Sequence, residues 1–586
     1  MKKWYWLMLS IVSCVLFVGC AKPGNAAPEV VVWAHQDSGT LAVAEETAQA
    51  FYVMAYTRGV KITGNTSVEL TVPPNWQIWQ GSEAPPAQGP GGTSQTLVFP
   101  WKLRATKDTE NSTDYSSANA AANVLLVARC SKVATESTLH LRWLQDSQVI
   151  AQRDATLKPV LLKWAFDQSL NNQMYSGMWL NDPHFNPQTM AEIYKGLYRA
   201  GINYVFITKA MFLQNQAILN QLGMKVFINQ WWTFKDYMPD APPAEAYSTM
   251  IDGSINKTRW SPTYMAQGEP AFINEIEKIV AELQQLKGIT GFMLDYEPGR
   301  AGIEADYGTA SKEAFEKYLG RKVLSWPQDV LENGKDQEAW INFRNDQSEA
   351  YVGWFQKIMK ARAPQLRLAI STSGATGKPD DPNRRLAVTD ITQFSRVANS
   401  IHPQLYSWSS NLRSPSQLTR FMDKLELGRT TIEGAHSPVY PAVGSMSGNL
   451  RLANPNYLRT QILYWWFYGA DGFETWQYFY GVDGNYLALA NEMTHLFQEA
   501  GNQPGGKPAD EIITAQSANQ LKILSRKNAD SSAAWVGVFN LNATPAEVNI
   551  QPKTGWQLAP GEAKAFTIKP WTVHVVQCLK SIVNVG

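Results

Sequence analysis

The sequence GFMLDYEPGR, from Gly291 to Arg300, is the most informative stretch of this 586-residue chain. As a β-strand it places Met293, Asp295 and Glu297 on one face, and the residues between them on the other. Two carboxylates on one inward face are rare, because like charges a few ångströms apart raise a pKa. The pair therefore indicates that the inner face of this strand belongs to a functional site.

Strands alternate with amphipathic helices on both sides of this stretch, from residue 170 to residue 505. Five helical segments end at a glycine that leads into a strand, namely Gly201, Gly223, Gly288, Gly428 and Gly469. A repeated helix, glycine and strand unit indicates right-handed crossovers and a parallel sheet. The strand candidates number eight, which predicts an α/β fold with a closed (β/α)8 TIM barrel. They are SGMWLND, INYVFIT, KVFINQWW, GFMLDYE, LRLAISTS, SIHPQLYSW, TTIEGAHSP and GFETWQYF.

The regions that flank the barrel contain only strand patterns separated by turn-rich segments. Residues 29–165 and residues 507–586 are therefore each expected to form a β-sandwich, the second smaller than the first. The sequence thus predicts a TIM barrel flanked by N-terminal and C-terminal β-sandwich domains.

The N-terminus has the pattern of an export signal. Lys2 and Lys3 precede an apolar run that ends at Val18, and this run is too short for a membrane span with its flanks. The following LFVGC resembles a bacterial lipobox, which implies that residues 1–20 are a lipoprotein signal peptide and that Cys20 carries a lipid anchor. We expect a location in the bacterial cell envelope, facing the periplasm or the cell surface. A plain cleaved signal is the alternative.

Composition restricts the partners. The 52 Lys and Arg residues nearly balance the 51 Asp and Glu residues, so no long-range field favours nucleic acid. Cys130 and Cys578 are too distant in sequence for a metal or redox motif, and we expect buried free thiols there, with one disulfide as the alternative. We expect no metal or cofactor, a monomer, and membrane contact only through the lipid anchor.

Active sites of such barrels lie at the C-terminal ends of the strands, which is where Glu297 falls. Long segments at Thr233–Met265 and Thr376–Asn383 are expected to shape a cleft there. The ends of other strands carry polar groups and aromatic rings. This combination suits a sugar, because the C–H face of a sugar stacks on an aromatic ring and its hydroxyls need hydrogen-bond partners. These residues are Asp182, Asn229, Gln230, Trp231, Tyr406, Trp408, Glu433, His436, Glu474 and Trp476.

Three segments resemble the family-18 glycoside hydrolases and their relatives. TGFMLDYE is similar to the fourth-strand signature of that family, which ends in D-x-E. IHPQLYSW resembles the sixth strand, whose final Tyr contacts substrate and matches Tyr406. ADGFETWQY is similar to the eighth strand, which ends in a Trp whose ring lies beneath the bound sugar. Trp476 matches that Trp. The resemblance covers only the barrel, and the chain differs from the family pattern at Thr290, Met293 and Ser407.

The resemblance and the chemistry of the residues imply the same activity. Cleavage of a glycosidic bond needs an acid that stays protonated near neutral pH, and Asp295 supplies the like charge that raises the pKa of Glu297. Glu297 is thus the expected general acid/base and Asp295 its orienting partner. If the substrate carries a 2-acetamido group, Asp295 would also hold that group as the internal nucleophile.

Two alternatives remain open on the sequence. In a two-carboxylate retaining glycosidase, Glu433 is the nucleophile and lies roughly 5 Å from the carboxyl group of Glu297. In a non-catalytic surface glycan-binding lipoprotein, Trp231, Trp232, Trp408 and Trp476 are platforms for sugar rings. Glu474 is a further acid candidate, although an acid bonded to Gln or Tyr in the barrel interior explains it as well. His436 is expected to donate a hydrogen bond to substrate or to a loop.

Overall fold

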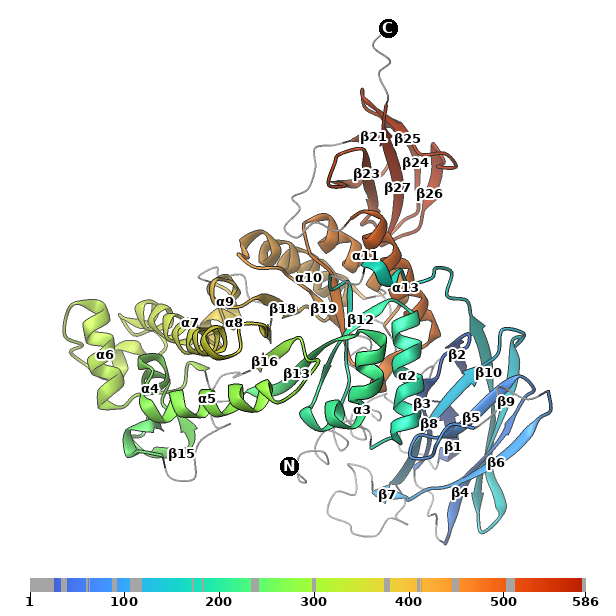
Figure 1. The fold of residues 1–586 in the computed structure, drawn as a ribbon, viewed down its shortest axis with the longest axis horizontal. Helices are drawn as coiled ribbons and strands as arrows, with labels where there is room; N and C mark the ends of the chain where they lie inside the picture. Colours follow the sequence, from blue (N-terminus) through green and yellow to red (C-terminus); the bar gives the residue numbers. More distant parts are fainter. Residues whose placement is uncertain are drawn as a thin grey trace.

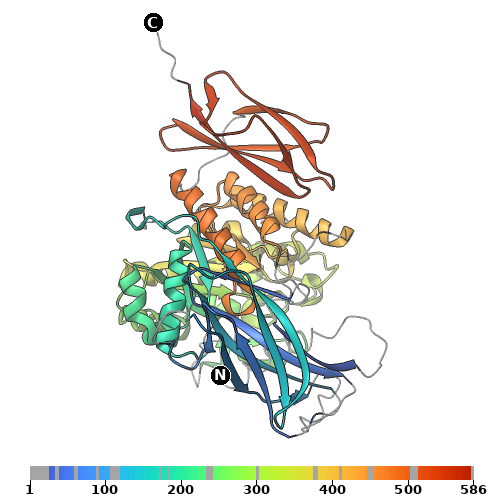
Figure 2. The ribbon, with the colours of Figure 1, turned by 90° about the vertical axis from the view of Figure 1, so that its right-hand side faces the viewer.

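The computed structural model describes residues 26–32, 39–58, 62, 64–86, 92–105, 119–170, 173–181, 184–232, 242–297, 302–373, 380–407, 412, 414–444, 453–501 and 512–581. A central barrel carries one sheet-rich unit beside its first helices and another above its last helices (Figure 1). The view from the side shows the two units at opposite ends of the molecule (Figure 2). The predicted fold class is confirmed.

The barrel is closed by eight parallel strands. In order around the barrel they are β11 (Ser176–Trp179), β12 (Ile202–Ile207), β13 (Lys225–Trp232), β16 (Gly291–Tyr296), β17 (Arg367–Ser373), β18 (Ser400–Gln404), β19 (Ala442–Gly444) and β20 (Phe473–Trp476). Sequence order and spatial order coincide, as the repeated right-handed crossover requires.

Helices form the outer layer of the barrel. They include α2 (Pro187–Arg199), α3 (Lys209–Leu222), α5 (Pro270–Gln284), α7 (Gln337–Arg362), α9 (Ile391–Val397), α10 (Pro415–Gly434), α11 (Pro455–Phe467) and α13 (Gly484–Glu499). The side chains of Asn186, Ser414 and Asn454 each accept a backbone hydrogen bond at the start of a helix whose first residue is Pro. These caps use the sequence signals expected of helix starts.

The segment TTIEGAHSP is not a strand, and this prediction is wrong. Residues 430–434 are the last part of α10, and the seventh strand is the shorter β19. Gly428 does not end a helix there, because it lies inside α10, where a Cβ would lie 2.2 Å from Nε1 of Trp465. The glycine thus marks close packing between α10 and α11, and the β-branched run after it stays helical.

The residues of β16 alternate as the sequence predicts. Met293 packs in the barrel interior with Phe227 of β13 and Ala369 of β17. Phe292 and Leu294 instead belong to the large cluster between the strands and the helices. The face that carries Asp295 is therefore the inner face of the barrel.

Between β13 and β16 the chain forms more structure than the long segment that the sequence predicts. Residues 233–241 lie outside the described ranges. A hairpin of β14 (Tyr247–Thr249) and β15 (Ile255–Trp260) follows, and then α4 (Pro262–Gln267). Helix α6 (Thr309–Leu319) lies beyond β16, and it packs with α4 against α7 at one edge of the barrel (Figure 1).

The N-terminal sandwich consists of two five-stranded sheets with one shared core. One sheet contains β1 (Ala26–Val32), β3 (Gln49–Arg58), β8 (Asn119–Cys130), β5 (Trp76–Gln80) and β7 (Arg104–Ala105). The other contains β2 (Thr40–Ala44), β10 (Gln148–Val160), β9 (Ser137–Gln145), β4 (Thr66–Val72) and β6 (Gln95–Pro100). It meets the barrel at α2, where Trp79 Nε1 donates to Thr189 Oγ1 at 2.9 Å.

The C-terminal sandwich has a three-stranded sheet of β21 (Ile513–Gln516), β24 (Ala546–Pro552) and β26 (Ala565–Ile568). Its second sheet contains β22 (Lys522–Lys527), β23 (Ala533–Asn540), β27 (Thr572–Lys580) and β25 (Trp556–Leu558). Arg526 fixes this unit to the barrel, because its buried Nη1 donates to the carbonyl oxygens of Trp466 at 2.6 Å and Ala470 at 3.0 Å. The guanidinium also lies 4.9 Å from the centre of the Trp466 ring.

Cys130 and Cys578 are buried free thiols, as the favoured alternative predicts. They lie in different sandwiches, on β8 and β27. Within the described ranges, no helix has the length and apolar character that crossing a membrane requires. Residues 1–20, including Cys20, lie outside those ranges.

Candidate active site

The inner face of the barrel becomes polar where β16, β17 and β18 end. Asp295 pairs in register with Ser371 of β17, and Ser373 pairs with Gln404 of β18. Asp295 is half-buried, whereas Glu297 lies one residue beyond the end of β16 and is open to solvent. The two acids that define the sequence motif therefore reach the mouth of the barrel together, as predicted.

Gln404 connects the residues of this polar face. Its Nε2 donates to Asp295 Oδ1 at 3.3 Å and to Ser371 Oγ at 3.2 Å. Gln404 also lies near enough to Glu297, and Ser371 near enough to Asp295, to lower the pKa of the neighbouring carboxyl group. The Gln404 amide thus bonds Asp295 and acts on both carboxyl groups.

Both carboxyl groups bind protons more tightly than an isolated acid. Burial raises the pKa of Asp295 well above its ordinary value, and the charge of Glu297 raises it further. Burial also raises the pKa of Glu297, while the hydrogen bond from Gln404 acts in the opposite direction. Glu297 is at once reachable by solvent and surrounded by protein atoms, as a carboxyl in a cleft is. The two acids titrate as a coupled pair that keeps a proton to a higher pH.

Aromatic residues stand beside the acids. The rings of Tyr406 and Trp476 lie with centroids 5.9 Å apart and planes inclined by 32°. Burial, followed by the charges of Glu297 and Asp295, raises the pKa of Tyr406 well above its ordinary value. The Tyr406 hydroxyl therefore stays protonated and can donate a hydrogen bond, while the half-buried Trp476 can stack on an apolar sugar face.

Glu474 lies below the site rather than in it. It is fully buried, accepts a hydrogen bond from Trp179 Nε1 at 3.0 Å, and contacts His402 Nδ1 at 2.6 Å. The other ring nitrogen of His402 contacts Ser400 Oγ at 2.9 Å. These contacts satisfy the buried acid within the barrel, so the prediction that Glu474 binds substrate is not met by this position.

Three other predicted residues do not face the mouth of the barrel. Gln230 has the outward orientation of Ile228 and lines a groove between α3 and α5. Glu433 is exposed on α10, where it pairs with Arg429 at 2.6 Å. His436 follows α10 and precedes β19, so it lies toward the opposite end of the barrel, with its backbone N–H bonded to Ser395 Oγ. Their placement in the site was wrong, in the last two cases because the seventh strand was misplaced.

Asn229 occupies the inward position that the sequence predicts. It shares the face of Phe227 and lies opposite Met293 of β16. Its Oδ1 is buried and has no hydrogen-bond partner among the described residues. Asn229 therefore offers an acceptor near the acids. Trp231 is in register with Asp295 on the backbone of β13, and Asp182 and Trp408 lie outside the described residues.

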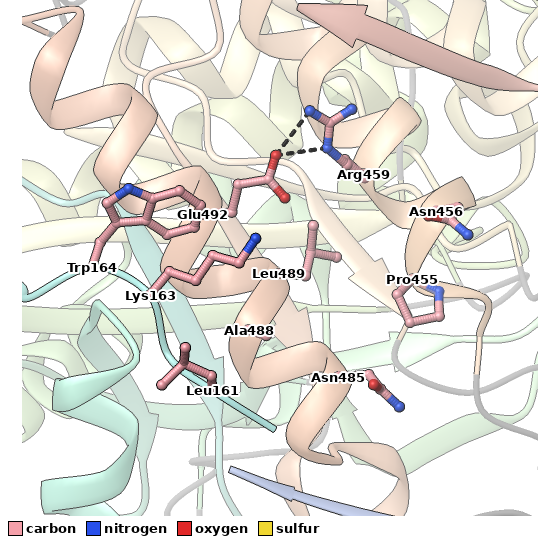
Figure 3. Close-up of a pocket in the computed structure, with 10 residues that line it drawn as sticks. All are labelled: Leu161, Lys163, Trp164, Pro455, Asn456, Arg459, Asn485, Ala488, Leu489 and Glu492. Atoms are coloured by element: carbon pink, nitrogen blue, oxygen red, sulfur yellow. Dashed lines mark hydrogen bonds and ion pairs between the residues drawn. The ribbon is translucent and has the colours of Figure 1, made fainter. Parts of the chain in front are cut away.

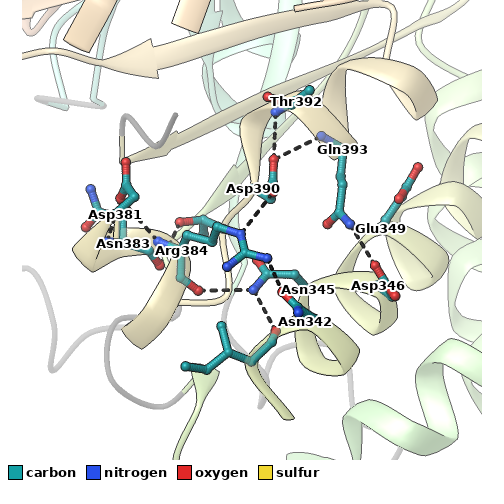
Figure 4. Close-up of polar contacts among 12 residues, drawn as sticks. Asn342, Asn345, Asp346, Glu349, Asp381, Asn383, Arg384, Asp390, Thr392 and Gln393 are labelled. Atoms are coloured by element: carbon teal, nitrogen blue, oxygen red, sulfur yellow. Dashed lines mark hydrogen bonds and ion pairs between the residues drawn. The ribbon is translucent and has the colours of Figure 1, made fainter. Parts of the chain in front are cut away.

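The segment after β17 is held by a polar network at Arg384 (Figure 4). Asp381 accepts backbone hydrogen bonds at the start of α8 (Pro382–Leu386), and Arg384 Nε donates to Asp390 Oδ2 at 3.3 Å. Arg384 also bonds Asn342 of α7, and its carbonyl accepts from Asn345 at 3.1 Å. This network attaches the C-terminal end of the predicted loop Thr376–Asn383 to α7. Residues 374–379 of that loop lie outside the described ranges.

Sequence reasoning missed Gln404, Ser371, His402 and Trp179. Strand alternation carried a signal for two of them, because Gln404 and His402 lie two and four residues before Tyr406 and therefore share its face. In the part of the chain that the structure describes, no three His, Cys, Asp or Glu residues gather in a group able to hold a metal ion.

No family model matches the chain, and no curated protein matches it. Among solved structures, a β-galactosidase from the psychrophilic Marinomonas is 11% identical, with 56% of this chain and 61% of that chain covered and a TM-score of 0.42. A β-galactosidase from the Antarctic haloarchaeon Halorubrum lacusprofundi is 11% identical, with 58% and 60% covered and a TM-score of 0.42. A β-galactosidase from Rahnella is 9% identical, with 71% and 99% covered and a TM-score of 0.48. The chain thus spans less than two thirds of the first two proteins.

The raised pKa of Asp295 predicts how the stability of the fold depends on pH. A carboxyl whose pKa is higher in the folded state than in the unfolded state destabilises the fold as pH rises from its ordinary pKa through the folded value. Asp295→Asn removes that penalty, so we expect the apparent melting temperature to rise by about 2 °C or more at pH 8 and little at pH 4. Differential scanning calorimetry at both pH values measures this.

The matched control is Asp423→Asn, which changes an exposed aspartate on α10. It should shift the melting temperature equally at both pH values. An equal shift for Asp295→Asn would show that the fold does not hold this carboxyl at a raised pKa.

Proposed function

We propose that this protein is a glycoside hydrolase that cleaves an oligo- or polysaccharide, with Glu297 as general acid/base and Asp295 as its partner. The observation that carries the proposal is the pair of neighbouring carboxyl groups at the end of β16, both with raised pKa, with Gln404 bonded to Asp295. A glycan-binding surface needs hydrogen-bond partners and rings, but it has no use for a retained proton.

The reaction uses the proton of the coupled pair. Glu297 gives a proton to the glycosidic oxygen as the bond to the anomeric carbon breaks, and the electrons of that bond go to the leaving oxygen. A bound sugar excludes water from Glu297 and so raises its pKa further, which keeps the acid protonated until the substrate arrives. The resulting carboxylate then takes a proton from the water that completes hydrolysis.

Positive charge develops on the anomeric carbon as the leaving group departs. Neither Glu433, on the outer surface of α10, nor the sealed Glu474 is placed to attack that carbon. Their positions argue against Glu433 or Glu474 as the nucleophile of a two-carboxylate scheme and support a nucleophile that the substrate itself supplies. We infer a 2-acetamido sugar, whose amide Asp295 would orient toward the anomeric carbon, with the Trp476 ring below the sugar and Tyr406 donating to it.

We also propose that the chain is exported and attached to a membrane through Cys20. The basic start, the short apolar run and the LFVGC motif support this proposal. We expect Cys20→Ser to abolish incorporation of radioactive palmitate and to move the protein from the membrane fraction to the soluble fraction. Continued labelling of Cys20→Ser would rule out the anchor.

The main test of the proposed function is Glu297→Gln, which preserves shape and removes the proton. On oligosaccharides that the wild type cleaves in a panel followed by NMR, we expect kcat to fall by about 10²- to 10⁴-fold, with Kd for the same sugar nearly unchanged. Glu433→Gln is the matched control, and its kcat should equal that of the wild type. If the wild type binds members of the panel and cleaves none, the protein is a glycan-binding lipoprotein instead.

The role of Gln404 is tested by the pH profile of kcat/KM. Gln404→Leu removes a hydrogen bond that favours the charged carboxylates, so the pKa of the pair rises and the alkaline limb moves to higher pH. We expect kcat to fall by about tenfold as well, because the acids lose their shared support. Gln230→Leu, which changes an outward-facing glutamine, should leave the profile unchanged. A Gln404→Leu profile identical to that of the wild type would show that Gln404 does not tune the pair.

A further inference from the structure

A second cavity lies on the outside of the barrel, away from the strand ends. Its volume is about 550 Å³, and the segment after β10 meets α11 and α13 around it (Figure 3). Its lining shares no residue with the carboxylate site. The residues that line it are Leu161, Lys163, Trp164, Pro455, Asn456, Arg459, Asn485, Ala488, Leu489 and Glu492.

One wall of this cavity is held rigidly in place. The backbone N–H of Trp164 donates to Asn491 Oδ1 at 3.0 Å, and Asn491 Nδ2 donates back to the Trp164 carbonyl at 2.9 Å. The Trp164 ring also stacks on His495, with centroids 5.0 Å apart and planes inclined by 19°. Because α13 fixes both the backbone and the ring, the wall is formed before any ligand binds.

An ion pair with no net charge also lines the cavity. Arg459 Nε donates to Glu492 Oε1 at 2.9 Å, and Arg459 Nη1 donates to the Val573 carbonyl of the C-terminal sandwich at 2.7 Å. The Arg459 guanidinium is therefore oriented by two partners, and its charge is balanced by Glu492. This pair contributes hydrogen-bonding groups to the cavity without a net charge.

Lys163 gives the cavity its net positive charge. Its ammonium lies 5.8 Å from the centre of the Trp164 ring, and Figure 3 shows it directed among the lining residues. Lys163 has no ion pair with any residue in the described part of the chain. The cavity thus presents one cation that pairs with no carboxylate of the described residues.

The remaining lining suits a small hydroxylated molecule. Leu489 and Ala488 form an apolar floor, and Leu161 at the rim is 56% exposed. Asn456 and Asn485 add side-chain amides, which can donate to and accept from hydroxyl groups. A cavity of about 550 Å³ falls within the size range of small-molecule sites in proteins.

We propose that this cavity is an accessory binding site for an acidic saccharide unit, whose carboxylate pairs with Lys163 and whose hydroxyls bond the amides and the Arg459–Glu492 pair. The apolar floor receives a C–H face of the sugar ring. The site does not depend on the reaction proposed for the barrel mouth, since none of the residues that form it contacts Asp295 or Glu297.

The test compares two sugars that differ only at C6, D-glucuronate and D-glucose, by isothermal titration calorimetry and ligand-observed NMR on the full chain. We use the Glu297→Gln background, so that turnover at the barrel mouth does not contribute. We expect D-glucuronate to bind about tenfold more tightly than D-glucose and to weaken as salt is added, because its carboxylate pairs with an exposed cation. Lys163→Gln should abolish that tenfold preference.

The matched control is Lys357→Gln. Lys357 is also an exposed lysine over a tryptophan ring, 4.3 Å from the centre of Trp354, but it lies on α7 outside the cavity. This variant should keep the preference for D-glucuronate. Equal affinity for the two sugars in the starting protein, no binding of either, or a preference that survives Lys163→Gln would each overturn the proposal.

Discussion

The rest of the site depends on one constraint: the carboxyl groups of Asp295 and Glu297 lie close together, and burial raises the pKa of both. The pleat of β16 places Asp295 on the inner face of the barrel, and Glu297 follows directly after the end of the strand. Two carboxyl groups that lie this close together avoid mutual repulsion when one of them keeps its proton. A carboxyl group that keeps its proton to a higher pH is what acid catalysis needs, so this geometry suits the proposed reaction.

The barrel supports this pair from below with a column of polar contacts. Gln404 bonds the pair, and two residues earlier on the same face of β18 lies His402, which contacts Glu474. Glu474 of β20 in turn accepts from Trp179 of the neighbouring strand β11. The side chains of His402, Glu474 and Trp179 all have hydrogen-bond partners among the described residues, so the column is a fixed support rather than a second reactive centre. Its hydrogen bonds link strands β11, β18 and β20, and β16 joins through Gln404.

Much of this architecture could be predicted from local sequence pattern. The alternation in GFMLDYE identified the inner face of β16, and the Pro-preceding caps at Asn186 and Asn454 marked helix starts. The prediction that a helix ends at Gly428 was wrong because a glycine before β-branched residues can have either of two structural roles. It can end a helix, or it can let another helix approach, and here the Trp465 ring requires the second. Only tertiary packing distinguishes the two.

The partners of the acids were harder to predict for a related reason. The hydrogen bonds of Gln404 cross from β18 to β16 and β17, and pairs so distant in sequence have no local signature. The N-terminal sandwich also contacts the barrel through residues that are far apart in the sequence. The Tyr478 hydroxyl, two residues after Trp476, accepts from the backbone N–H of Ala50 in β3 at 3.2 Å, and Phe479 packs on Phe185 after β11. The sandwich therefore holds the segment that presents Trp476, because that segment gains a fixed partner outside the barrel. A domain that supports the aromatic floor of a site in this way contributes to its geometry without contacting a ligand.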